Sequence, residues 1–393
     1  MTHKDRDEPR PDPESTTIDP PTVSPRRTPA PTRPQPLPTP PQPQPNQQQP
    51  PTQQSPPNQG PAQPGPPPPP ATTTDFNAGR PAPRPPAPPP TAAEPGVDPE
   101  KLVLQDVHGD SRLRRVGRAA VRPFRPADEM QRIAEHGRWI QHPVTTGRRI
   151  AVIGVRGGTG KSTVAALVAS VFARYRQDRV LALDVDPERG SLPLRLGLRG
   201  QYTLTDLARA ELATASFDQV EPYLAHPLER LWALPGTRGP IGGAALSADT
   251  YRSTGIPLTR FFGVTITDSG AGIRTELHRA VLRAAHAQVL VATATPEGAA
   301  SVGHALDWMA ANGLQALHPR TIVVFTAHSP TMAQGLDVKR ASEVLTEVGA
   351  GVVRMGYDRH MAVGAALDPS RLAQATHVTA VTIAAEALRR SVS

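Results

Sequence analysis

The stretch RRIAVIGVRGGTGKST occupies residues 148–163 and joins a strand pattern to a helix pattern. The apolar run RRIAVIGV has the length and composition of a buried strand. The run VAALVASVFARYR, which begins after Thr163, has helical spacing. Between them lies a loop with four glycines and one lysine, and two hydroxyl residues follow the lysine. A strand, a glycine-rich turn and a helix in this order predict an anion site at the turn.

The same alternation continues from this stretch to the end of the chain. Strand-length apolar runs are separated in several places by helical patterns such as LHRAVLRAAH and EGAASVGHALDWMAA. Buried strands that alternate with helices predict an α/β fold, a mostly parallel sheet with helices on both faces. We therefore expect one domain over residues 148–393, about 245 residues long. The other expected strands are RVLALD, RLWALPG, FFGVTITD, QVLVAT, RTIVVFT and GVVRMG.

The loop itself has the chemistry of a phosphate site. Its glycines let the backbone wrap a phosphate without Cβ clashes, and Lys161 adds a charge that reaches the β- and γ-phosphates. The Ser162 hydroxyl is a suitable Mg²⁺ ligand. In the strict phosphate-loop pattern, the residue six positions before the lysine is a glycine. In this chain that residue is Val155. The expected nucleotide-binding residues are Gly157, Gly158, Thr159, Gly160, Lys161, Ser162 and Thr163.

Acidic residues follow two of the other predicted strands. RVLALDVDP ends in Asp184 and Asp186, and FFGVTITDSGAG reaches Asp268 just before two glycines. A carboxylate at a strand end beside a phosphate loop holds Mg²⁺, directly or through water, and a second one orients an attacking water. A single aspartate at such a place can instead cap a helix. The glycines after Asp268 would let a backbone N–H approach the γ-phosphate and move when it leaves.

These three motifs carry a family resemblance. GVRGGTGKST, LALDVDPERG and TITDSGAGI resemble the nucleotide motifs of the MinD/ParA family of deviant-Walker ATPases. The resemblance covers about 240 residues and includes the later run VATATPEGAASVGHAL. It implies a P-loop NTPase fold, bound ATP and Mg²⁺, and a homodimer that forms on ATP. It also implies slow hydrolysis, with the two nucleotide states acting as a molecular switch.

The resemblance also assigns residue roles. By it, Lys161 and Ser162 bind phosphate and Mg²⁺, and Thr163 contacts the α-phosphate. Asp186 positions the water that attacks the γ-phosphate. Asp268 supports the Mg²⁺ shell, so Ser162 and Asp268 are the expected metal-site residues. Asp186 and Lys161 are thereby candidate catalytic residues.

Arg156 stands where the family has a signature lysine, which reaches across the dimer to the partner's phosphates. An arginine keeps the charge and grips phosphate oxygens with two hydrogen bonds, so Arg156 is a third catalytic candidate, acting in trans. It could equally mark a tuned or weakened hydrolase. Two more positions depart from the family. Thr326 replaces an asparagine that reads the base, and Gly356 replaces a proline before Tyr357, which leaves the strictness of adenine selectivity open.

Residues 1–100 differ from the rest of the chain. They hold 35 of the 49 prolines and one aromatic residue, Phe76. Such a segment cannot bury enough apolar surface to offset the entropy of ordering it, which predicts a disordered proline-rich arm. The arm is either a spacer or a ligand for a protein partner with aromatic-lined grooves.

Residues 101–147 are expected to form a basic linker and a leader helix. The segment RLRRVGRAAVRPFR, residues 112–125, has six arginines and no acid. Its apolar residues recur at helical spacing, so it could contact anionic lipid, DNA or an acidic partner. The alternative is a solvated connector whose apolar edge packs on the next domain. A short amphipathic helix over residues 130–140 is expected to dock on that domain.

The remaining features limit the place and role of the protein. The chain has no cysteine, no secretory signal pattern and no apolar run of about 18 residues, which predicts a cytoplasmic protein with at most peripheral contact at the inner membrane. The last run, VTAVTIAAEALRRSVS, is poor in aromatic anchors, which favours a packing helix over a membrane anchor.

A proline-rich arm before such an ATPase is similar in layout to the EspI-like ATPases of type VII (ESX) secretion. Three roles follow as hypotheses. The favoured one is a secretion-associated or positioning ATPase, and the second is a DNA-partitioning ParA-type ATPase. The third is a nucleotide-binding scaffold with little turnover.

Overall fold

The computed structural model describes residues 107–110, 127–188, 190–198, 202–210, 212–237, 245–332 and 336–393. The proline-rich arm predicted over residues 1–100 and the arginine-rich segment 112–125 lie outside these residues. The division into arm, linker and ATPase domain therefore stays a prediction.

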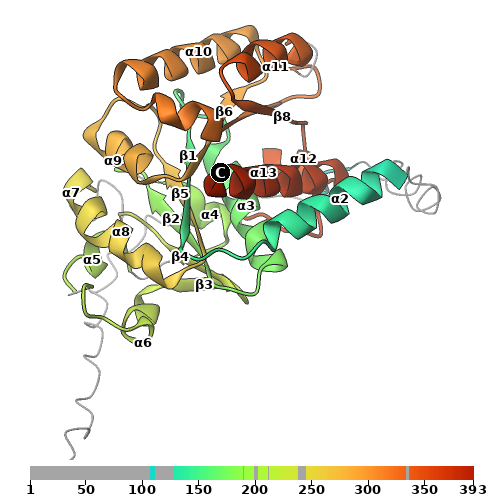
Figure 1. The fold of residues 1–393 in the computed structure, drawn as a ribbon. Helices are drawn as coiled ribbons and strands as arrows, with labels where there is room; N and C mark the ends of the chain where they lie inside the picture. The colour runs from blue at the N-terminus through green and yellow to red at the C-terminus, as the bar shows by residue number, and fades with distance from the viewer. Residues whose placement is uncertain are drawn as a thin grey trace, which may run out of the picture. The chain divides into compact units, whose positions relative to one another are not determined.

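One eight-stranded sheet organises the described part of the chain (Figure 1). Its strand order is β3-β4-β2-β5-β1-β6-β7-β8, and every neighbouring pair is parallel except β3 and β4. The prediction of a mostly parallel α/β sheet is confirmed. The strands are β1 (Arg148–Ile153), β2 (Val180–Val185), β3 (Ala225–Leu228), β4 (Leu231–Leu234), β5 (Val264–Ser269), β6 (Ala287–Thr293), β7 (Thr321–Thr326) and β8 (Gly351–Met355).

Helices cover both faces of this sheet (Figure 1). The α-helices are α2 (Ala127–Ile140), α3 (Lys161–Tyr175), α4 (Leu192–Arg195), α5 (Leu204–Leu207), α6 (Phe217–Val220), α7 (Ala248–Thr250), α8 (Ile256–Leu258), α9 (Glu276–Ala284), α10 (Pro296–Ala311), α11 (Val338–Glu347), α12 (Arg359–Ala362) and α13 (Gln374–Val392). The short helices of other types are η3 (Glu221–Tyr223), η4 (Tyr251–Gly255), η5 (Thr259–Phe261) and η6 (Gln315–Arg320).

Alternate residues of each central strand point to two separate cores. In β1, Ile150 and Val152 pack with α3 and α13, whereas Ala151 and Ile153 pack with the α9 and α10 side. Period-two alternation in a strand buried on both sides produces this division, because successive side chains point to opposite faces. Both faces of β1 are therefore fixed, and so is the loop that leaves it.

The last helix, α13, is a packing helix of the domain. Ala384 and Leu388 are fully buried, and α13 contacts α2, α3 and four strands of the sheet. Figure 1 shows α2 running beside it. This arrangement agrees with the interpretation of the C-terminal run as a packing helix.

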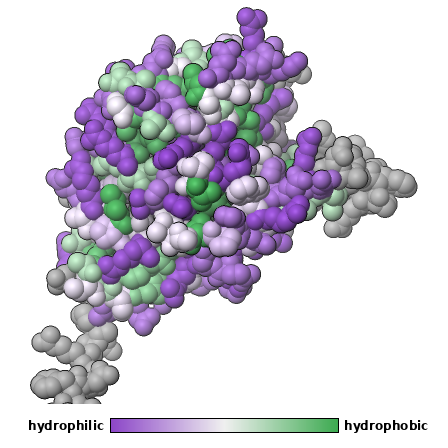
Figure 2. Space-filling view, viewed as in Figure 1, coloured by the Kyte–Doolittle hydropathy of each residue, from purple (hydrophilic) through white to green (hydrophobic). Residues whose placement is uncertain are grey.

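The visible surface is mixed in polarity. Figure 2 shows hydrophilic residues interspersed with small apolar patches over one face. Among the described residues, the exposed large apolar side chains are Met130, Trp139, Leu228, Val344 and Val348. None of the described helices is both long and apolar enough to span a membrane.

Parallel neighbours bring three loops to one edge of the sheet. β1 lies between β5 and β6, and β2 lies on the other side of β5. The carboxyl ends of parallel strands meet at the same edge, which is where α/β proteins bind ligands. The loops after β1, β2 and β5 carry the three motifs found in the sequence, and they meet there.

Candidate functional site

The loop after β1 is shaped by its glycines. Gly158 and Gly160 have φ values of +73° and +90°, which residues with a side chain rarely adopt. A Cβ at Gly154 would lie 2.7 Å from the carbonyl oxygen of Val291, so this position requires glycine too. The helix α3 begins at Lys161, and no side chain caps its first turn. The N–H groups of that turn face the loop, an arrangement that binds anions.

Lys161 is buried beside this loop. The residue is 8% exposed, and its ammonium donates to the main-chain oxygen of Arg156 at 3.2 Å. Burial lowers the pKa of Lys161, and the nearby Asp268 and Asp186 act in the opposite direction. A buried cation whose hydrogen-bond acceptor is a neutral carbonyl is stabilised when an anion binds beside it.

The two acids after β2 have different surroundings. Asp184 is 2% exposed, and its Oδ1 accepts the backbone N–H of Asp186 at 2.9 Å. Burial raises the pKa of Asp184 well above its usual range, and the neighbouring Asp268 is the second cause of this increase. Asp186 is half-buried and accepts the N–H of Glu188 at 2.9 Å. Asp184 therefore braces the loop, and Asp186 is the acid that remains accessible.

Asp268 is the last residue but one of β5 and is in parallel register with Asp184 of β2. It is 1% exposed and accepts a hydrogen bond from the Ser162 hydroxyl. Burial raises the pKa of Asp268 to about 7, while Ser162 and the Lys161 ammonium act in the opposite direction. Its Oδ1 has no hydrogen-bond partner in the described part of the chain. That oxygen is an orphaned buried acceptor beside a hydroxyl.

This pair fits a particular kind of metal site. No group of three His, Cys, Asp or Glu side chains that could hold a metal occurs among the residues described. Mg²⁺ needs few protein ligands when it keeps several waters and takes others from substrate phosphates. Ser162 and the free oxygen of Asp268 suit that mode, because one offers a hydroxyl and the other an acceptor for a bound water.

The loop after β5 is tied to the phosphate loop. The N–H of Gly272 donates to the carbonyl of Gly154 at 3.0 Å. A Cβ at Gly270 would lie 3.1 Å from Asp186 Oδ2, so this loop also touches the accessible acid. The Ser269 hydroxyl donates to Val152 at 3.1 Å. All three motif loops are therefore joined at the sheet edge.

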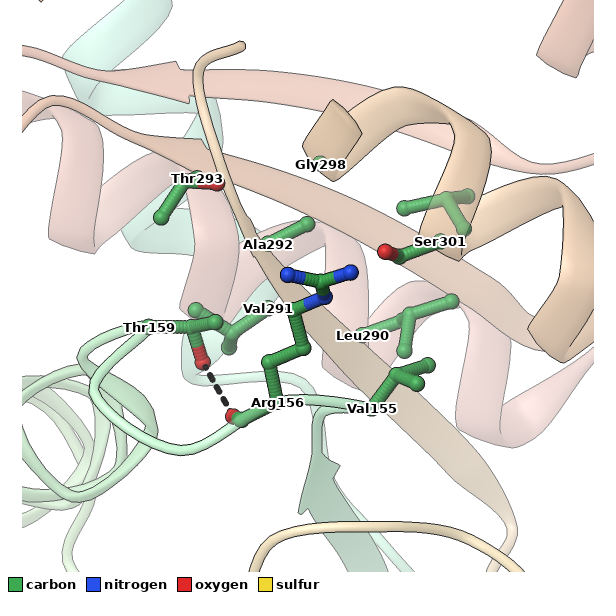
Figure 3. A pocket seen from close by; sticks show the side chains of 10 residues that line it. Val155, Arg156, Thr159, Leu290, Val291, Ala292, Thr293, Gly298 and Ser301 are labelled. Carbon is green, nitrogen blue, oxygen red and sulfur yellow. Dashed lines mark hydrogen bonds between the residues drawn. The ribbon is translucent and has the colours of Figure 1, made fainter. Parts of the chain in front are cut away.

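Arg156 points away from the centre of this cluster. Its guanidinium forms an ion pair with Glu297 at 2.7 Å, and the two side chains are 57% and 69% exposed. Figure 3 shows the guanidinium above β6, beside Ser301 of α10, in a pocket that Thr159 also lines. The structure thus brings Lys161, Ser162, Asp186 and Asp268 together and leaves the Arg156 side chain on the surface.

Thr326, at the end of β7, is buried against the phosphate loop. Its hydroxyl lies 2.8 Å from the main-chain oxygen of Thr159 and 3.1 Å from Nε2 of His328. The hydroxyl therefore braces the loop, and the exposed imidazole of His328 stands beside it. At the other departure, a Cβ on Gly356 would meet nothing within 4 Å.

One residue of the site was missed by the sequence reasoning. His278, at the start of α9, is 3% exposed and contacts the loop after β5 through the carbonyl of Gly270. The signal was weak, since a single histidine in TELHRA belongs to no motif. Its position ten residues after Asp268, in the helix that follows the loop, could have indicated it.

The chain is similar in sequence to known proteins. Residues 150–364 match the family model described as the CobQ/CobB/MinD/ParA nucleotide binding domain. The ESX-1 secretion-associated protein EspI of Mycobacterium tuberculosis is 34% identical over 240 residues, which is 60% of this chain and 35% of that protein. The chromosome-partitioning ATPase Soj of Thermus thermophilus is 34% identical over 95 residues, 24% of this chain and 34% of that protein. The matches thus span about a third of these curated relatives.

Solved structures share the fold. A ParA family ATPase from Chlorobium tepidum has a TM-score of 0.52 at 18% identity, covering 61% of this chain and 98% of that one. The cell division ATPase MinD of Pyrococcus furiosus has a TM-score of 0.50 at 20% identity, with the same coverage. At these identities the likeness concerns the fold alone.

Proposed function

This chain belongs to the CobQ/CobB/MinD/ParA nucleotide-binding family, and from that premise we propose that it is a Mg²⁺-dependent ATPase. It binds Mg-ATP, forms a homodimer on ATP and hydrolyses the nucleotide slowly. The ATP and ADP states then serve as the two positions of a molecular switch that engages and releases a partner.

One observation carries the proposal. A buried lysine, a hydroxyl and two carboxylates meet at a helix N-terminus with a glycine-shaped loop. The site around Lys161 combines positive charge for phosphates with acidic groups for a cation and a water. A site with positive charge alone would suit a simple anion. A site that also has acidic groups suits a triphosphate with Mg²⁺.

Each residue then has a defined task. The amides of Gly157 to Lys161 surround the phosphates, and the Lys161 ammonium lies against the β- and γ-phosphates. Ser162 and Asp268 would hold Mg²⁺, which when bound would neutralise charge on the phosphate oxygens. Asp186 accepts a hydrogen bond from the attacking water, and Thr163 contacts the α-phosphate.

The cellular role is proposed from the relatives. The similarity to EspI, which is named for ESX-1 secretion, favours a secretion-associated or positioning ATPase in the cytoplasm. The shorter similarity to Soj, named for chromosome partitioning, supports DNA partitioning as the second candidate. A nucleotide-binding scaffold with little turnover is the third, and Arg156 in place of lysine is the observation that favours it.

The N-terminal residues supply the proposed partner contacts. The proline-rich arm recruits a protein partner, and the arginine-rich segment 112–125 contacts DNA or the inner membrane peripherally. Six arginines that neutralise phosphates would make such binding fall steeply with salt. Sedimentation of the full chain with anionic liposomes and with DNA tells which of the two binds, and a truncation that lacks residues 1–125 should lose that binding.

The first prediction concerns nucleotide binding. Lys161→Ala removes the one side-chain charge aimed at the β/γ-phosphates, so we expect at least a hundredfold loss of Mg-ATP affinity, about 3 kcal/mol. Isothermal titration calorimetry of the full chain measures it. Lys339→Ala is the matched control, because Lys339 is exposed on α11, away from the motif loops.

Binding of Mg-ATP by Lys161→Ala at the wild-type affinity would remove the phosphate-loop assignment. A wild type that binds Mg-ATP but releases no phosphate, with liposomes, DNA or arm ligands present, would leave the scaffold as the function.

A further inference from the structure

His278 connects the loop after β5 to the helix that follows it. Its Nε2 lies 3.2 Å from the carbonyl oxygen of Gly270, and its Nδ1 lies 2.6 Å from the hydroxyl of Thr275. Thr275 is the N-cap of α9, so its position is set by the helix. The imidazole therefore bridges a rigid helix end and a glycine-containing loop.

The hydrogen bonds around the ring determine where its proton lies. The Gly270 carbonyl can only accept, so Nε2 carries a hydrogen and donates it there. The Thr275 hydroxyl oxygen accepts the backbone N–H of His278 at 3.2 Å. Burial lowers the pKa of His278 below its usual value of 6.5, and the opposing effect of the bond to Gly270 does not reverse this, so the ring is neutral near pH 7. A neutral ring with its hydrogen on Nε2 accepts at Nδ1, where the Thr275 hydroxyl donates.

Holding the Gly270 carbonyl fixes the next amide. In a planar trans peptide the C=O and the following N–H point in opposite directions. The N–H of Ala271 therefore points away from His278. Ala271 itself adjoins the phosphate loop, since a Cβ at Gly157 would lie 3.9 Å from its methyl group.

The rest of the loop is held as well. Gly272 donates to Gly154 and has a φ of +100°, and a Cβ added to it would lie 3.9 Å from the His278 ring. The peptide that joins Gly270 to Ala271 lies in the chain between Asp268 and the bond from Gly272 to Gly154. The Ser269 hydroxyl also lies 3.5 Å from the Gly270 carbonyl, but its one hydrogen has a nearer acceptor in Val152 at 3.1 Å. The orientation of this peptide therefore depends mainly on the bond from His278.

We infer that His278 is a positioning residue for recognition of the γ-phosphate. By holding the Gly270 carbonyl, it keeps the Ala271 N–H directed at the place where the terminal phosphate of a nucleotide in the phosphate loop lies. The chain thereby distinguishes a nucleoside triphosphate from a diphosphate. This inference rests on the proposed function, because it needs a nucleotide in that loop.

A pair of amide variants tests it. In His278→Gln the side-chain amide nitrogen reaches the position of Nε2, and in His278→Asn it reaches only that of Nδ1. We expect His278→Asn and His278→Ala to bind AMPPNP with Mg²⁺ five- to tenfold more weakly, the effect of about one hydrogen bond, and ADP within twofold of wild type. We expect His278→Gln to restore most of the AMPPNP affinity.

His318→Ala is the matched control. His318 also bonds a main-chain oxygen, that of Leu306 at 3.1 Å, and it lies in η6. Its loss should leave the ratio of AMPPNP to ADP affinity unchanged. Calorimetry gives both affinities, and thermal unfolding gives the stability of each variant.

Three outcomes overturn the inference in distinguishable ways. Equal losses for AMPPNP and ADP, together with a lowered Tm, mean that His278 only packs the loop. An unchanged affinity ratio in His278→Asn means that the Ala271 amide does not depend on it. A wild type that binds neither nucleotide removes the proposed function itself, whatever the variants do. If His278→Ala does not fold, the comparison of the Gln and Asn variants decides.

Discussion

Asp184 and Asp186 are two residues apart, and the structure gives them opposite surroundings. A Cβ at Gly190 would overlap the Asp184 carboxyl, so this acid is enclosed by the backbone that follows β2. The Asp184 carboxyl also accepts backbone N–H groups from Asp186 and Leu192. Asp186 is half-buried and faces the Gly270 loop. Asp184 thus braces the loop after β2, and Asp186 is left accessible for the catalytic role proposed for it.

This division yields a prediction with opposite readouts. Asp186→Ala should keep Mg-ATP affinity and lower the rate of phosphate release at least a hundredfold, because only the attacking water loses its acceptor. Asp184→Ala should instead lower the free energy of unfolding by about 1–3 kcal/mol, because it leaves buried N–H groups unpaired. Phosphate-release assays and chemical unfolding measure the two effects. Release by Asp186→Ala at the wild-type rate would move the water-positioning role to another residue.

His286 supplies a pH prediction. Its Nδ1 accepts the N–H of Arg149 at 3.0 Å, and burial together with Arg149, Arg148 and Arg320 lowers the pKa of His286 to about 4. The unfolded chain takes up this proton near pH 6.5, whereas the folded chain resists it. The stability that the neutral ring contributes is therefore fully present above pH 6.5 and is lost as the pH falls towards 4.

The variant His286→Asn keeps an acceptor at the position of Nδ1 for the Arg149 N–H and does not titrate. We expect its advantage in stability over wild type to grow between pH 7 and pH 4.5, by roughly 1–2 kcal/mol after allowance for solvent screening. Thermal unfolding over that range measures it. Other buried histidines titrate alike in both proteins, so parallel curves would contradict the assignment to His286.

At the scale of elements, the sequence predicted the strands that form apolar runs and missed the one that does not. Seven runs correspond to β1, β2 and β4 to β8. The missed strand is β3, whose sequence AHPL contains a proline and has no apolar alternation. It is the antiparallel edge strand, where a missing N–H is tolerated, so its pairing depends on β4 rather than on its own pattern.

The residues of the candidate site likewise divide into those that the sequence predicts and those that it does not. Lys161, Ser162 and Asp268 belong to local motifs, so spacing alone could indicate them. The contact of His278 with Gly270 depends on how α9 packs after the loop, which no short pattern encodes. The direction of Arg156 was also not predictable, because its partner Glu297 is 141 residues away in sequence.

Residues 107–110 show another long-range contact, which leads to a prediction. Gly109 donates to the carbonyl of Arg371 at 2.7 Å, and His360 Nδ1 lies 3.0 Å from the carbonyl of Val107. A Cβ at Gly109 would lie 2.5 Å from the Asp358 carboxylate and 2.4 Å from Ala373 N. This segment therefore lies against α12 and the start of α13.

We expect Gly109→Ala to lower the free energy of unfolding by about 1–3 kcal/mol, because the added methyl group has no room. The control is Gly303→Ala, where a Cβ in α10 would meet nothing within 4 Å and should stabilise the helix by about 0.5–1 kcal/mol. Urea unfolding of both variants gives the comparison. Equal stability of Gly109→Ala and wild type would mean that residues 107–110 do not hold this position in solution.

At the scale of the whole molecule, the state of Arg156 bears on assembly. In the single chain its guanidinium is paired with Glu297, and both side chains are largely exposed. An exposed ion pair contributes little, about 0.2–1 kcal/mol, so it is readily exchanged for a stronger partner. A phosphate group of a second copy is such a partner, because an arginine grips it with two charge-assisted hydrogen bonds. The arrangement thus suits a residue that pairs with Glu297 in the single chain and contacts the phosphates of a second copy in the dimer.

The last prediction follows from that exchange. With hydrolysis blocked by Asp186→Ala, the protein should be monomeric with ADP and dimeric with ATP, because facing triphosphates repel unless bridging cations neutralise them. Arg156→Ala in this background should lose the dimer and keep ATP, since Lys161 still holds the nucleotide in cis. Arg156→Lys should keep much of the dimer, and Glu297→Gln should strengthen it up to about fivefold by releasing the arginine. Light scattering with ATP and ADP measures each state. If the alanine variant dimerises as well as its parent, Arg156 serves only its own loop, and the Glu297 pair is an ordinary surface contact.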